Sequence, residues 1–340
     1  MHKSERIIIF ELNWMGDVLF SFPFLRAIKK KFPDSYIACV VVPEYVDLLV
    51  NNPWINDVHA LSNDNRLTSL GEKLAFIRMI KKEKYDISFL LKPSGTKAAM
   101  AVLAGIGIRI GFGGKNAALT REVEMPEGVH RADQLLALAG AVGVESADGS
   151  YEYFFSMEDE ERADTILHEA GCGIRRMVAF NPGGNWPPKR WPAENFICLG
   201  KKILDQFSDV EVIITGAGKD RELTRRIARG INSPWCRTVA GKTGLNELAC
   251  IFKKCTLVVS ADSGPLHLAS ATGTTTIGLF GPTSYKITGP RGRGKNIIVA
   301  KEVDCQVPCY IKSCEKDYYC MKSITAGEVL KAAEEALRES

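Results

Sequence analysis

The chain has 340 residues, of which 46% are hydrophobic and 25% are charged, and its formal net charge at pH 7 is +4. These values are ordinary for a globular protein, and the length favours two domains, because single cores seldom grow beyond about 250–300 residues. The sequence contains no apolar run long enough for a membrane-spanning helix, and its start, MHKSERIIIFEL, resembles no cleavable signal, so we expect a cytoplasmic protein.

In the first half of the chain, short apolar runs alternate with amphipathic segments. Strands that alternate with helices predict a parallel sheet with helices on both of its faces. We expect strands at residues 6–12, 37–42 and 87–91 and helices at residues 18–32 and 130–142, with a further apolar stretch at 98–110.

The second half repeats this alternation after a polar and acidic stretch at residues 149–161. We therefore predict an α/β protein with one domain over residues 1–157, a second over 158–325, and a helix over 326–340 that could pack back on the first domain. Ligands of such sheets bind beyond the carboxyl ends of the strands, here in a cleft between the domains. Strands are expected at residues 177–180, 210–215, 257–260 and 275–280, and helices at 193–205, 221–230, 245–253 and 326–338.

Residues 258–282, VVSADSGPLHLASATGTTTIGLFGP, are typical of a strand, a polar turn, a short helix and a second strand. The turn places Asp262, Ser263 and Gly264 directly before Pro265, a residue that suits the first position of a helix. A helix N-terminus at the end of a strand can bind an anion, and His267 faces the same end of the helix. The turn fits either a diphosphate site or an ordinary capped turn in which His267 is structural.

Two other loops follow expected strands. In NWMGD, Asp17 comes directly after a glycine and fits either a helix cap or a base that faces the cleft. In NPGGNWPPKRWP, Lys189 lies in a glycine-rich loop, where a lysine can pair with a phosphate or remain solvated.

Four of the ten cysteines, Cys305, Cys309, Cys314 and Cys320, lie within sixteen residues of one another. Their spacing lacks a CxxC pair, so a structural zinc, disulfides and free thiols all remain open.

Basic residues gather in short runs at 29–31, 81–84, 225–229 and 291–295. Such runs fit either solvated helix faces or attraction to an anionic partner such as phosphorylated lipid headgroups. No RNA-binding signature or zinc-finger spacing favours nucleic acid as a partner.

The ordered combination of three segments resembles glycosyltransferase family 9, the heptosyltransferases of lipopolysaccharide core synthesis, over nearly the full length. The family's opening strand, loop and helix are similar to NWMGDVLFSFPFLRAIKKKFP, and its central phosphate loop to NPGGNWPPKRWPAENF. Its C-terminal signature is similar to GKTGLNELACIFKKCTLVVSADSGPLHLASATGTTTIGLFGPT. The Asn-Trp before Gly-Asp and the KRWP run are more like the second heptosyltransferase of the pathway than the first. Pro265 and Thr274 depart mildly from the family pattern.

This resemblance implies a GT-B fold, with two Rossmann-like doubly wound domains that face each other across a cleft. It implies that the first domain binds the acceptor and the second the nucleotide-sugar, with Asp17 as the catalytic base and Lys189 as the phosphate-binding lysine. Candidate donor-binding residues are Asn13, Gly16, Asn185, Glu222, Gly241, Lys242, Thr243, Asp262, Ser263, Gly264, Pro265 and His267. Candidate acceptor-binding residues are Lys97, Arg121 and Arg131.

The implied reaction transfers heptose from ADP-heptose to heptosyl-Kdo-lipid A with inversion, at the inner face of the inner membrane, with the protein bound peripherally. No D-x-D pair suggests a metal–diphosphate clamp, so we expect no catalytic metal and no cofactor. The alternatives are a family-nine transferase with another donor or acceptor, a UDP-sugar epimerase of the same fold, and a cysteine-based metal or redox module. A nicotinamide oxidoreductase is disfavoured, because GIGIRIG at residues 105–111 has the wrong spacing.

Overall fold

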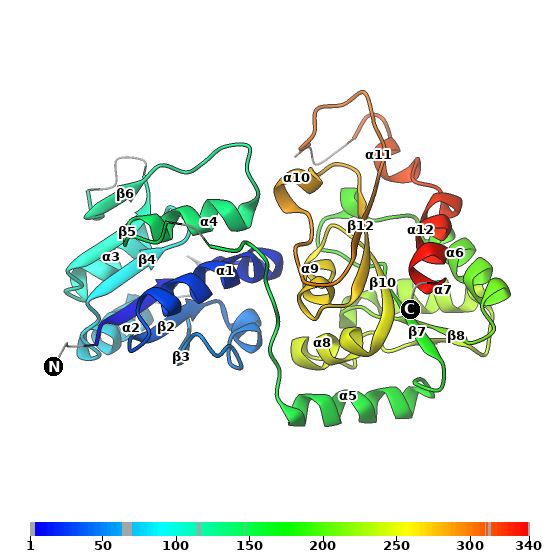
Figure 1. Ribbon diagram of the computed structural model, residues 1–340, viewed down its shortest axis with the longest axis horizontal. Coiled ribbons are helices and arrows are strands. Elements are labelled where there is room, and N and C mark those ends of the chain that lie inside the picture. Colours follow the sequence, from blue (N-terminus) through cyan, green and yellow to red (C-terminus); the bar gives the residue numbers. More distant parts are fainter. Residues whose placement is uncertain are drawn as a thin grey trace. The chain divides into compact units, whose positions relative to one another are not determined.

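The computed structural model describes residues 4–62, 70–113, 117–145, 147–309, 311 and 314–338. Contacts divide the chain into two compact units, Met1–Tyr151 and Glu152–Ser340 (Figure 1). The boundary that we expected from the sequence, after residue 157, falls at the start of the first helix of the second unit.

The first unit is a six-stranded sheet in the order β3-β2-β1-β4-β5-β6, and every neighbouring pair of its strands is parallel. The predicted parallel α/β architecture is therefore confirmed for this unit. Its elements are β1 (Arg6–Phe10), α1 (Met15–Lys31), β2 (Tyr36–Val41), the 3₁₀ helix η1 (Pro43–Leu48), β3 (Asp57–Ala60), α2 (Leu70–Lys82), β4 (Ile87–Leu90), α3 (Gly95–Leu103), β5 (Ile108–Phe112), β6 (Arg121–Val123) and α4 (Arg131–Gly140).

The second unit has the same plan, with the strand order β12-β11-β10-β7-β8-β9 and parallel pairing throughout. Its elements are α5 (Met157–Ala170), β7 (Arg176–Asn181), η2 (Pro187–Lys189), α6 (Ala193–Gln206), β8 (Val210–Ile214), η3 (Gly218–Asp220), α7 (Arg221–Ile231), β9 (Cys236–Thr238), α8 (Leu245–Lys254), β10 (Cys255–Ala261), α9 (Gly264–Ala271), β11 (Thr275–Phe280), α10 (Tyr285–Thr288), β12 (Asn296–Ala300), α11 (Tyr319–Lys322) and α12 (Ala326–Arg338).

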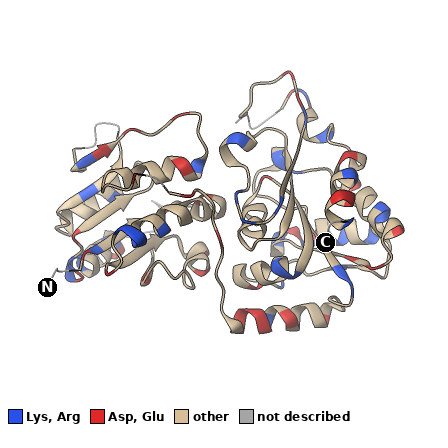
Figure 2. Cartoon of the chain, viewed as in Figure 1, with Lys and Arg blue, Asp and Glu red and all other residues tan. Residues whose placement is uncertain are grey.

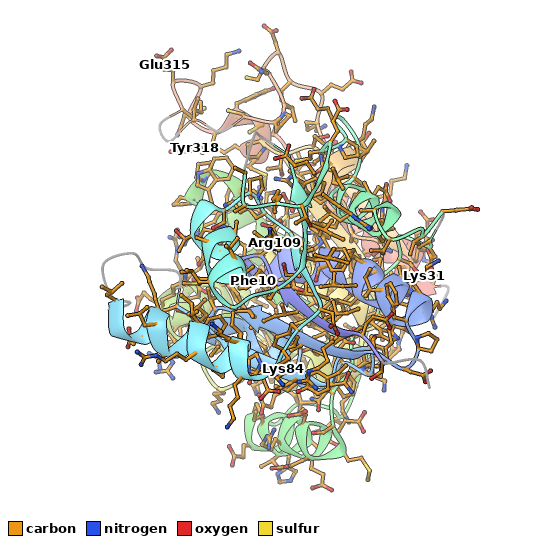
Figure 3. The ribbon with its side chains drawn as sticks, turned by 90° about the vertical axis from the view of Figure 1, so that its left-hand side faces the viewer. Phe10, Lys31, Lys84, Arg109, Glu315 and Tyr318 are labelled. Atoms are coloured by element: carbon orange, nitrogen blue, oxygen red, sulfur yellow. The ribbon has the colours of Figure 1, made fainter. Side chains whose placement is uncertain are left out.

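The central strands carry the most apolar sequences, because helices cover both of their faces. In β1, RIIIF, the last four residues are buried, and in β10, CTLVVSA, all but Thr256 are buried. Figure 3 shows Phe10 within the sheet of the first unit and Lys31 and Lys84 at its periphery.

The strands at the edges of the two sheets were not predicted from the sequence. β3, β6, β9 and β12 lie at the four sheet edges, and most of their residues are only partly buried. An edge strand needs less apolar sequence, so its pattern is weak. The apolar stretch at 98–110 is likewise divided, with α3 ending before Gly105 (φ +80°) and β5 beginning after it.

Local sequence explains where α5 begins and ends. The side chain of Ser156 accepts a hydrogen bond from the backbone N–H of Asp159, whose carboxylate in turn accepts from the backbone N–H of Ser156. Gly171, in the left-handed conformation at φ +69°, ends the helix. Figure 2 shows the acidic residues of α5, three of which lie in its first turn, where the helix dipole favours negative charge.

The C-terminal helix α12 packs within the second unit. It contacts α6, β10, β11 and β12, and it buries Val329, Leu330, Ala333 and Leu337 in the core of that unit. Its apolar face therefore covers the second sheet, and the expectation that this helix packs on the first domain stays a prediction.

Across the described ranges, no helix combines the length and the apolarity that crossing a bilayer requires.

A buried carboxyl group stands at the end of β1. The side chain of Glu11 is fully buried, with Oε1 3.0 Å from the hydroxyl of Ser21 and no hydrogen-bond partner for Oε2 among the described residues. Burial raises the pKa of Glu11 to about 8, against the smaller lowering effects of Ser21, the Leu12 backbone and Lys97. We therefore expect this side chain to be protonated in the folded protein at neutral pH.

Substitution Glu11→Gln should change how stability depends on pH. Glu11 holds its proton up to about pH 8 when folded but only to about pH 4.5 when unfolded, so between these values the folded state binds more protons. Over that range this group should make the free energy of unfolding fall with rising pH, by up to about 1.4 kcal/mol per pH unit. Urea unfolding of the parent and the variant across this range should show the slope in the parent only.

The control for this experiment is Glu161→Gln, on the exposed side of α5, which should keep the slope of the parent. Identical slopes in the parent and in Glu11→Gln would show that Glu11 is ionised in the folded protein.

Candidate functional site

Each sheet has one point at which the direction of winding reverses. In the first unit this point lies between β1 and β4, and in the second it lies between β7 and β10. Ligands of open parallel sheets bind outside the carboxyl ends of the strands at such a point. The three loops that the sequence singled out follow β1, β7 and β10, so all three begin at a switch point.

In the second unit, the switch point brings the two predicted loops into direct contact. Nζ of Lys189, in the loop after β7, donates a hydrogen bond to Oδ2 of Asp262 at 2.7 Å. Nε2 of His267, on α9, lies 3.3 Å from Oδ1 of the same carboxylate. The hydroxyl of Thr288, on α10, donates to Oδ2 at 3.3 Å. Asp262 is thus the centre of the cluster.

The charges of this cluster are unequally exposed. The side chains of Asp262 and His267 are 4% and 3% exposed, whereas that of Lys189 is 27% exposed. Burial by itself raises the pKa of Asp262, but the hydrogen bond from His267 and the charge of Lys189 outweigh it and hold that pKa well below its usual range. The carboxylate therefore remains ionised and holds the Lys189 ammonium, which still reaches solvent.

The N-terminus of α9 adds a partial positive charge next to this cluster. Ser263 is the N-cap residue in an extended conformation, and Gly264 and Pro265 open the helix. The hydroxyl of Ser263 pairs with that of Ser260 at 3.1 Å and does not cap the helix. The turn is therefore not the ordinary capped turn that the sequence also allowed, and the helix end is available to an anion.

The predicted residues Gly241, Lys242 and Thr243 follow β9 at the same edge of the sheet. Gly241 has φ +72°, and its N–H donates to the carbonyl of Gly216 at 2.8 Å. A Cβ at Gly241 would lie 2.9 Å from Cα of Gly218, so only glycine allows the loops after β8 and β9 to approach this closely. Lys242 is exposed, and Thr243 is half-buried.

Asn185 and Glu222 also lie at this edge. Asn185, in the loop after β7, accepts a hydrogen bond from Lys219, and Glu222 is exposed in the first turn of α7. Neither residue has a hydrogen bond or ion pair to Asp262 or Lys189 among the described contacts, so the structure places them on the same edge but not in the same cluster.

In the first unit, Asp17 is the third residue of α1. The N-cap residue of this helix is Trp14, and its side chain makes no capping hydrogen bond, so the interpretation of Asp17 as the cap is wrong. Asn13 and Gly16 lie beside it in the same loop and first turn, and both are half-buried. Tyr45 lies in η1, after β2. Burial raises the pKa of Tyr45, the Met15 backbone lowers it, and the charges of Glu44 and Asp17 raise it.

Of the three candidate acceptor residues, Lys97 lies at the switch point of the first unit. Its Nζ donates to the backbone carbonyl of Glu11 at 2.9 Å, which joins the start of α3 to the end of β1. Burial lowers the pKa of Lys97, and the charge of Glu11 opposes this shift. Arg131 begins α4 and donates to Gln134 at 2.7 Å. Arg121 is at the amino end of β6 and donates to Ala141, so it is not brought together with Lys97.

Sequence reasoning missed three residues at these edges: Tyr45, Thr288 and Asp220. Asp220 is buried in the segment where we singled out Glu222, and its carboxylate accepts from the N–H of Ala217 at 3.1 Å. A Cβ at Gly183 would lie 2.6 Å from Oδ2 of Asp220, so the first glycine of NPGG makes room for this carboxylate. The two adjacent glycines of NPGG were the sequence feature that could have indicated a side chain packed closely against this loop.

None of the ten cysteines, which all lie in the described ranges, forms a disulfide. The four clustered cysteines line one pocket together.

Comparison with known proteins identifies the family of this chain. The model of glycosyltransferase family 9 (heptosyltransferase) matches residues 73–319. Lipopolysaccharide heptosyltransferase 2 of Escherichia coli K12 is 25% identical over 306 residues, which cover 86% of this chain and 87% of that protein.

Solved structures are similar over almost the whole chain. A family 9 glycosyl transferase of Veillonella parvula has a TM-score of 0.87 at 24% identity, covering 99% of this chain and 98% of that one. The E. coli ADP-heptose lps heptosyltransferase II has a TM-score of 0.81 at 22% identity, covering 98% and 99%. These similarities confirm the predicted GT-B fold. Because the family model spans well over half of the sequence, the chain belongs to glycosyltransferase family 9.

Proposed function

We propose that this glycosyltransferase transfers a heptose from ADP-heptose to a heptosyl-Kdo-lipid A acceptor of the lipopolysaccharide inner core. The name of the E. coli K12 relative supports the lipopolysaccharide acceptor, and the name of the structurally similar E. coli ADP-heptose lps heptosyltransferase II supports the ADP-heptose donor. We further propose that the transfer inverts the anomeric carbon and needs no divalent cation.

The observation that carries this proposal is the buried Asp262 carboxylate, which holds Lys189 at the switch point of the second unit. An ammonium group has three N–H donors, and Asp262 accepts only one of them. The others remain for the diphosphate of the donor. The N-terminus of α9 begins two residues after Asp262 and provides a second positive element without a metal ion.

The leaving group explains why positive charge is needed here. When the bond between the sugar and ADP breaks, negative charge grows on the outer phosphate. Donors that are already oriented toward this charge stabilise the transition state more than the ground state. Asp262 supplies this orientation by restraining Lys189, and His267 and Thr288 hold Asp262 in turn.

The base in our proposal is Asp17, since inversion by a single displacement needs one group to accept the proton of the acceptor hydroxyl. Its position in the first turn of α1, at the switch point of the first unit, supports this role. Lys97 stands at the same switch point and is our first candidate for an anionic group of the acceptor. Arg131 and Arg121 are weaker candidates, because they lie on α4 and β6, away from the switch point between β1 and β4.

The acceptor is a lipid, so we also propose that the protein acts in the cytoplasm and binds peripherally to the inner face of the inner membrane. The last turns of α1 and α2 carry the exposed basic residues Lys30, Lys31, Lys81 and Lys82, which would favour an anionic surface.

A transfer assay tests the proposed function directly. ADP-heptose, ADP-glucose and UDP-sugars would each be supplied with heptosylated or unheptosylated Kdo-lipid A. We expect product from ADP-heptose with the heptosylated acceptor, with opposite anomeric configurations in donor and product by NMR, and equal rates in EDTA and in Mg²⁺. Efficient use of another donor or acceptor would favour the alternative family-nine reaction, and loss of turnover in EDTA would contradict metal independence.

Substitution Asp17→Asn should lower kcat by about 10²–10⁴-fold, the usual contribution of general base catalysis. The Kd for ADP, measured by calorimetry, should change little, because Asp17 belongs to the first unit and the proposed phosphate site to the second. Asp34→Asn, at an exposed position after α1, is the matched control and should keep the parent rate. A near-normal kcat in Asp17→Asn would remove this residue from the base role.

Substitution Lys189→Ala should weaken ADP binding and also lower kcat by roughly 10²-fold, the typical loss when one oriented donor is removed. Lys201→Ala, on an exposed position of α6, controls for the loss of one surface charge and should change neither value. If the Kd for ADP were the same in Lys189→Ala and in the parent, the proposed phosphate contact would be wrong.

A further inference from the structure

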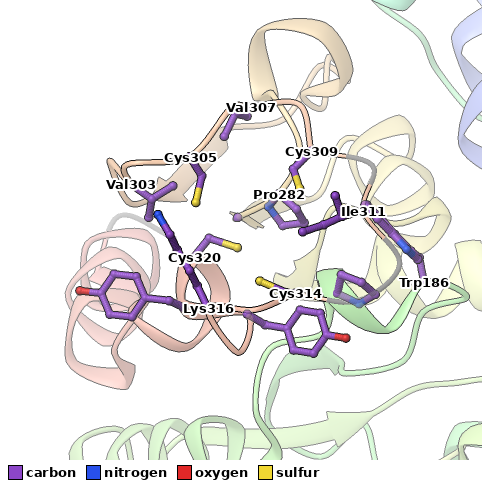
Figure 4. Close-up of a pocket in the computed structure, with 14 residues that line it drawn as sticks. Trp186, Pro282, Val303, Cys305, Val307, Cys309, Ile311, Cys314, Lys316 and Cys320 are labelled. Atoms are coloured by element: carbon purple, nitrogen blue, oxygen red, sulfur yellow. The ribbon is translucent and has the colours of Figure 1, made fainter.

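Four cysteines of the second unit converge on one pocket that the proposed reaction does not use. Cys305, Cys309, Cys314 and Cys320 all line it, and Figure 4 shows their sulfur atoms directed into a common space. Three of them come from the segment between β12 and α11, and Cys320 lies in α11. In its described part, the segment at residues 301–318 contains no helix or strand, so regular backbone hydrogen bonding does not determine its shape.

The four thiols share the pocket with one basic side chain. Lys316 lines the same pocket and brings one positive charge to it. Four sulfur donors that line one pocket match the ligand set that soft metal ions prefer.

The other side of the pocket belongs to the edge of the unit at which we propose that the nucleotide binds. Trp186 and Pro188, which come shortly before Lys189 in the loop after β7, line the pocket, as does Pro282 after β11. The N–H of Cys309 donates to the carbonyl of Pro282 at 2.7 Å. The ammonium of Lys189 also lies 5.7 Å from the ring centre of Trp186. The cysteine segment therefore packs on the same loop that positions Lys189.

We propose that Cys305, Cys309, Cys314 and Cys320 bind one thiophilic metal ion, zinc or iron, as four thiolates. Tetrahedral coordination by four sulfurs is typical of these metals, and a site with four protein ligands keeps no open position for substrate. The ion is structural. It fastens the segment at residues 301–318 against the loop of Trp186 and Lys189, and it does not take part in the transfer reaction.

To bind the metal ion, the four cysteines must move closer together and lose their protons. Among the described residues, no three Cys, His, Asp or Glu side chains already stand close enough together to hold a metal ion. The four sulfurs must therefore move inward, which a segment without helix or strand permits. Each ligand loses its proton to solvent when the sulfur–metal bond forms, so affinity should rise with pH. Four thiolates and a divalent ion carry a net charge of −2, and Lys316 offsets part of it.

Metal content and cobalt spectroscopy of the full-length protein test this proposal without an activity assay. We expect elemental analysis of protein purified without chelators to find one zinc or iron per chain, and the element found identifies the metal. After removal of this ion under reducing conditions, added Co²⁺ should produce the visible absorption of a tetrahedral thiolate complex. The metal-free protein should also melt at a lower temperature.

Two ligand variants and a matched control locate the ion. Cys309→Ser and Cys314→Ser should each lower the affinity for Co²⁺ at least about tenfold and alter its spectrum. Cys198→Ser removes a half-buried thiol of α6 in the same unit and should keep both the metal content and the spectrum.

Two results would overturn the proposal. The first is metal-free protein whose intact mass is lower by two hydrogens for each bridge, which would show disulfides. The second is metal-free protein that does not bind Co²⁺ and whose four thiols react freely with a thiol reagent, which would show free cysteines. Neither result would affect the proposed heptosyl transfer.

Discussion

The buried carboxylate of Asp262 is the group on which the candidate site depends. Its charge is expensive to remove from water, and His267 and Lys189 compensate for it, so the three side chains hold one another in place. The same interaction makes Lys189 a restrained donor and not a mobile surface lysine. A restrained cation loses little entropy when an anion binds, and for this reason the cluster suits a reaction in which charge develops on a departing phosphate.

The two sheets have the same topology, but the buried carboxyl group beside one of them is ionised and that beside the other is protonated. Asp262 follows β10 and is ionised because a lysine and a histidine contact its oxygens. Glu11 follows β1, and the nearby Lys97 contacts its backbone carbonyl and not its carboxyl group. Burial therefore prevails, and the pKa of Glu11 rises to about 8. The topology of a sheet places certain residues at the switch point, where a ligand can bind. The groups in direct contact with each of these residues determine whether it is charged.

Much of the fold could be predicted from the sequence because local patterns encode it. Buried parallel strands such as β1 and β10 have continuous apolar runs, and helices such as α6 and α12 have an amphipathic repeat. The three loops of the candidate site were also accessible, because short ordered motifs of glycine, proline, aspartate and lysine mark the ends of central strands.

The edge strands and several site residues could not be predicted in this way. An edge strand such as β12 is stabilised by pairing with its neighbour, and its partly exposed residues need no apolar pattern. Asp220 and Thr288 meet the site only because loops distant in sequence end at the same edge of the sheet. The sequence by itself determined the family, the central strands and the loops that carry Asp17, Lys189 and Asp262. Only the tertiary structure decided which side chains contact Asp262 and that four cysteines share one pocket, because such contacts depend on distances between segments that no local pattern records.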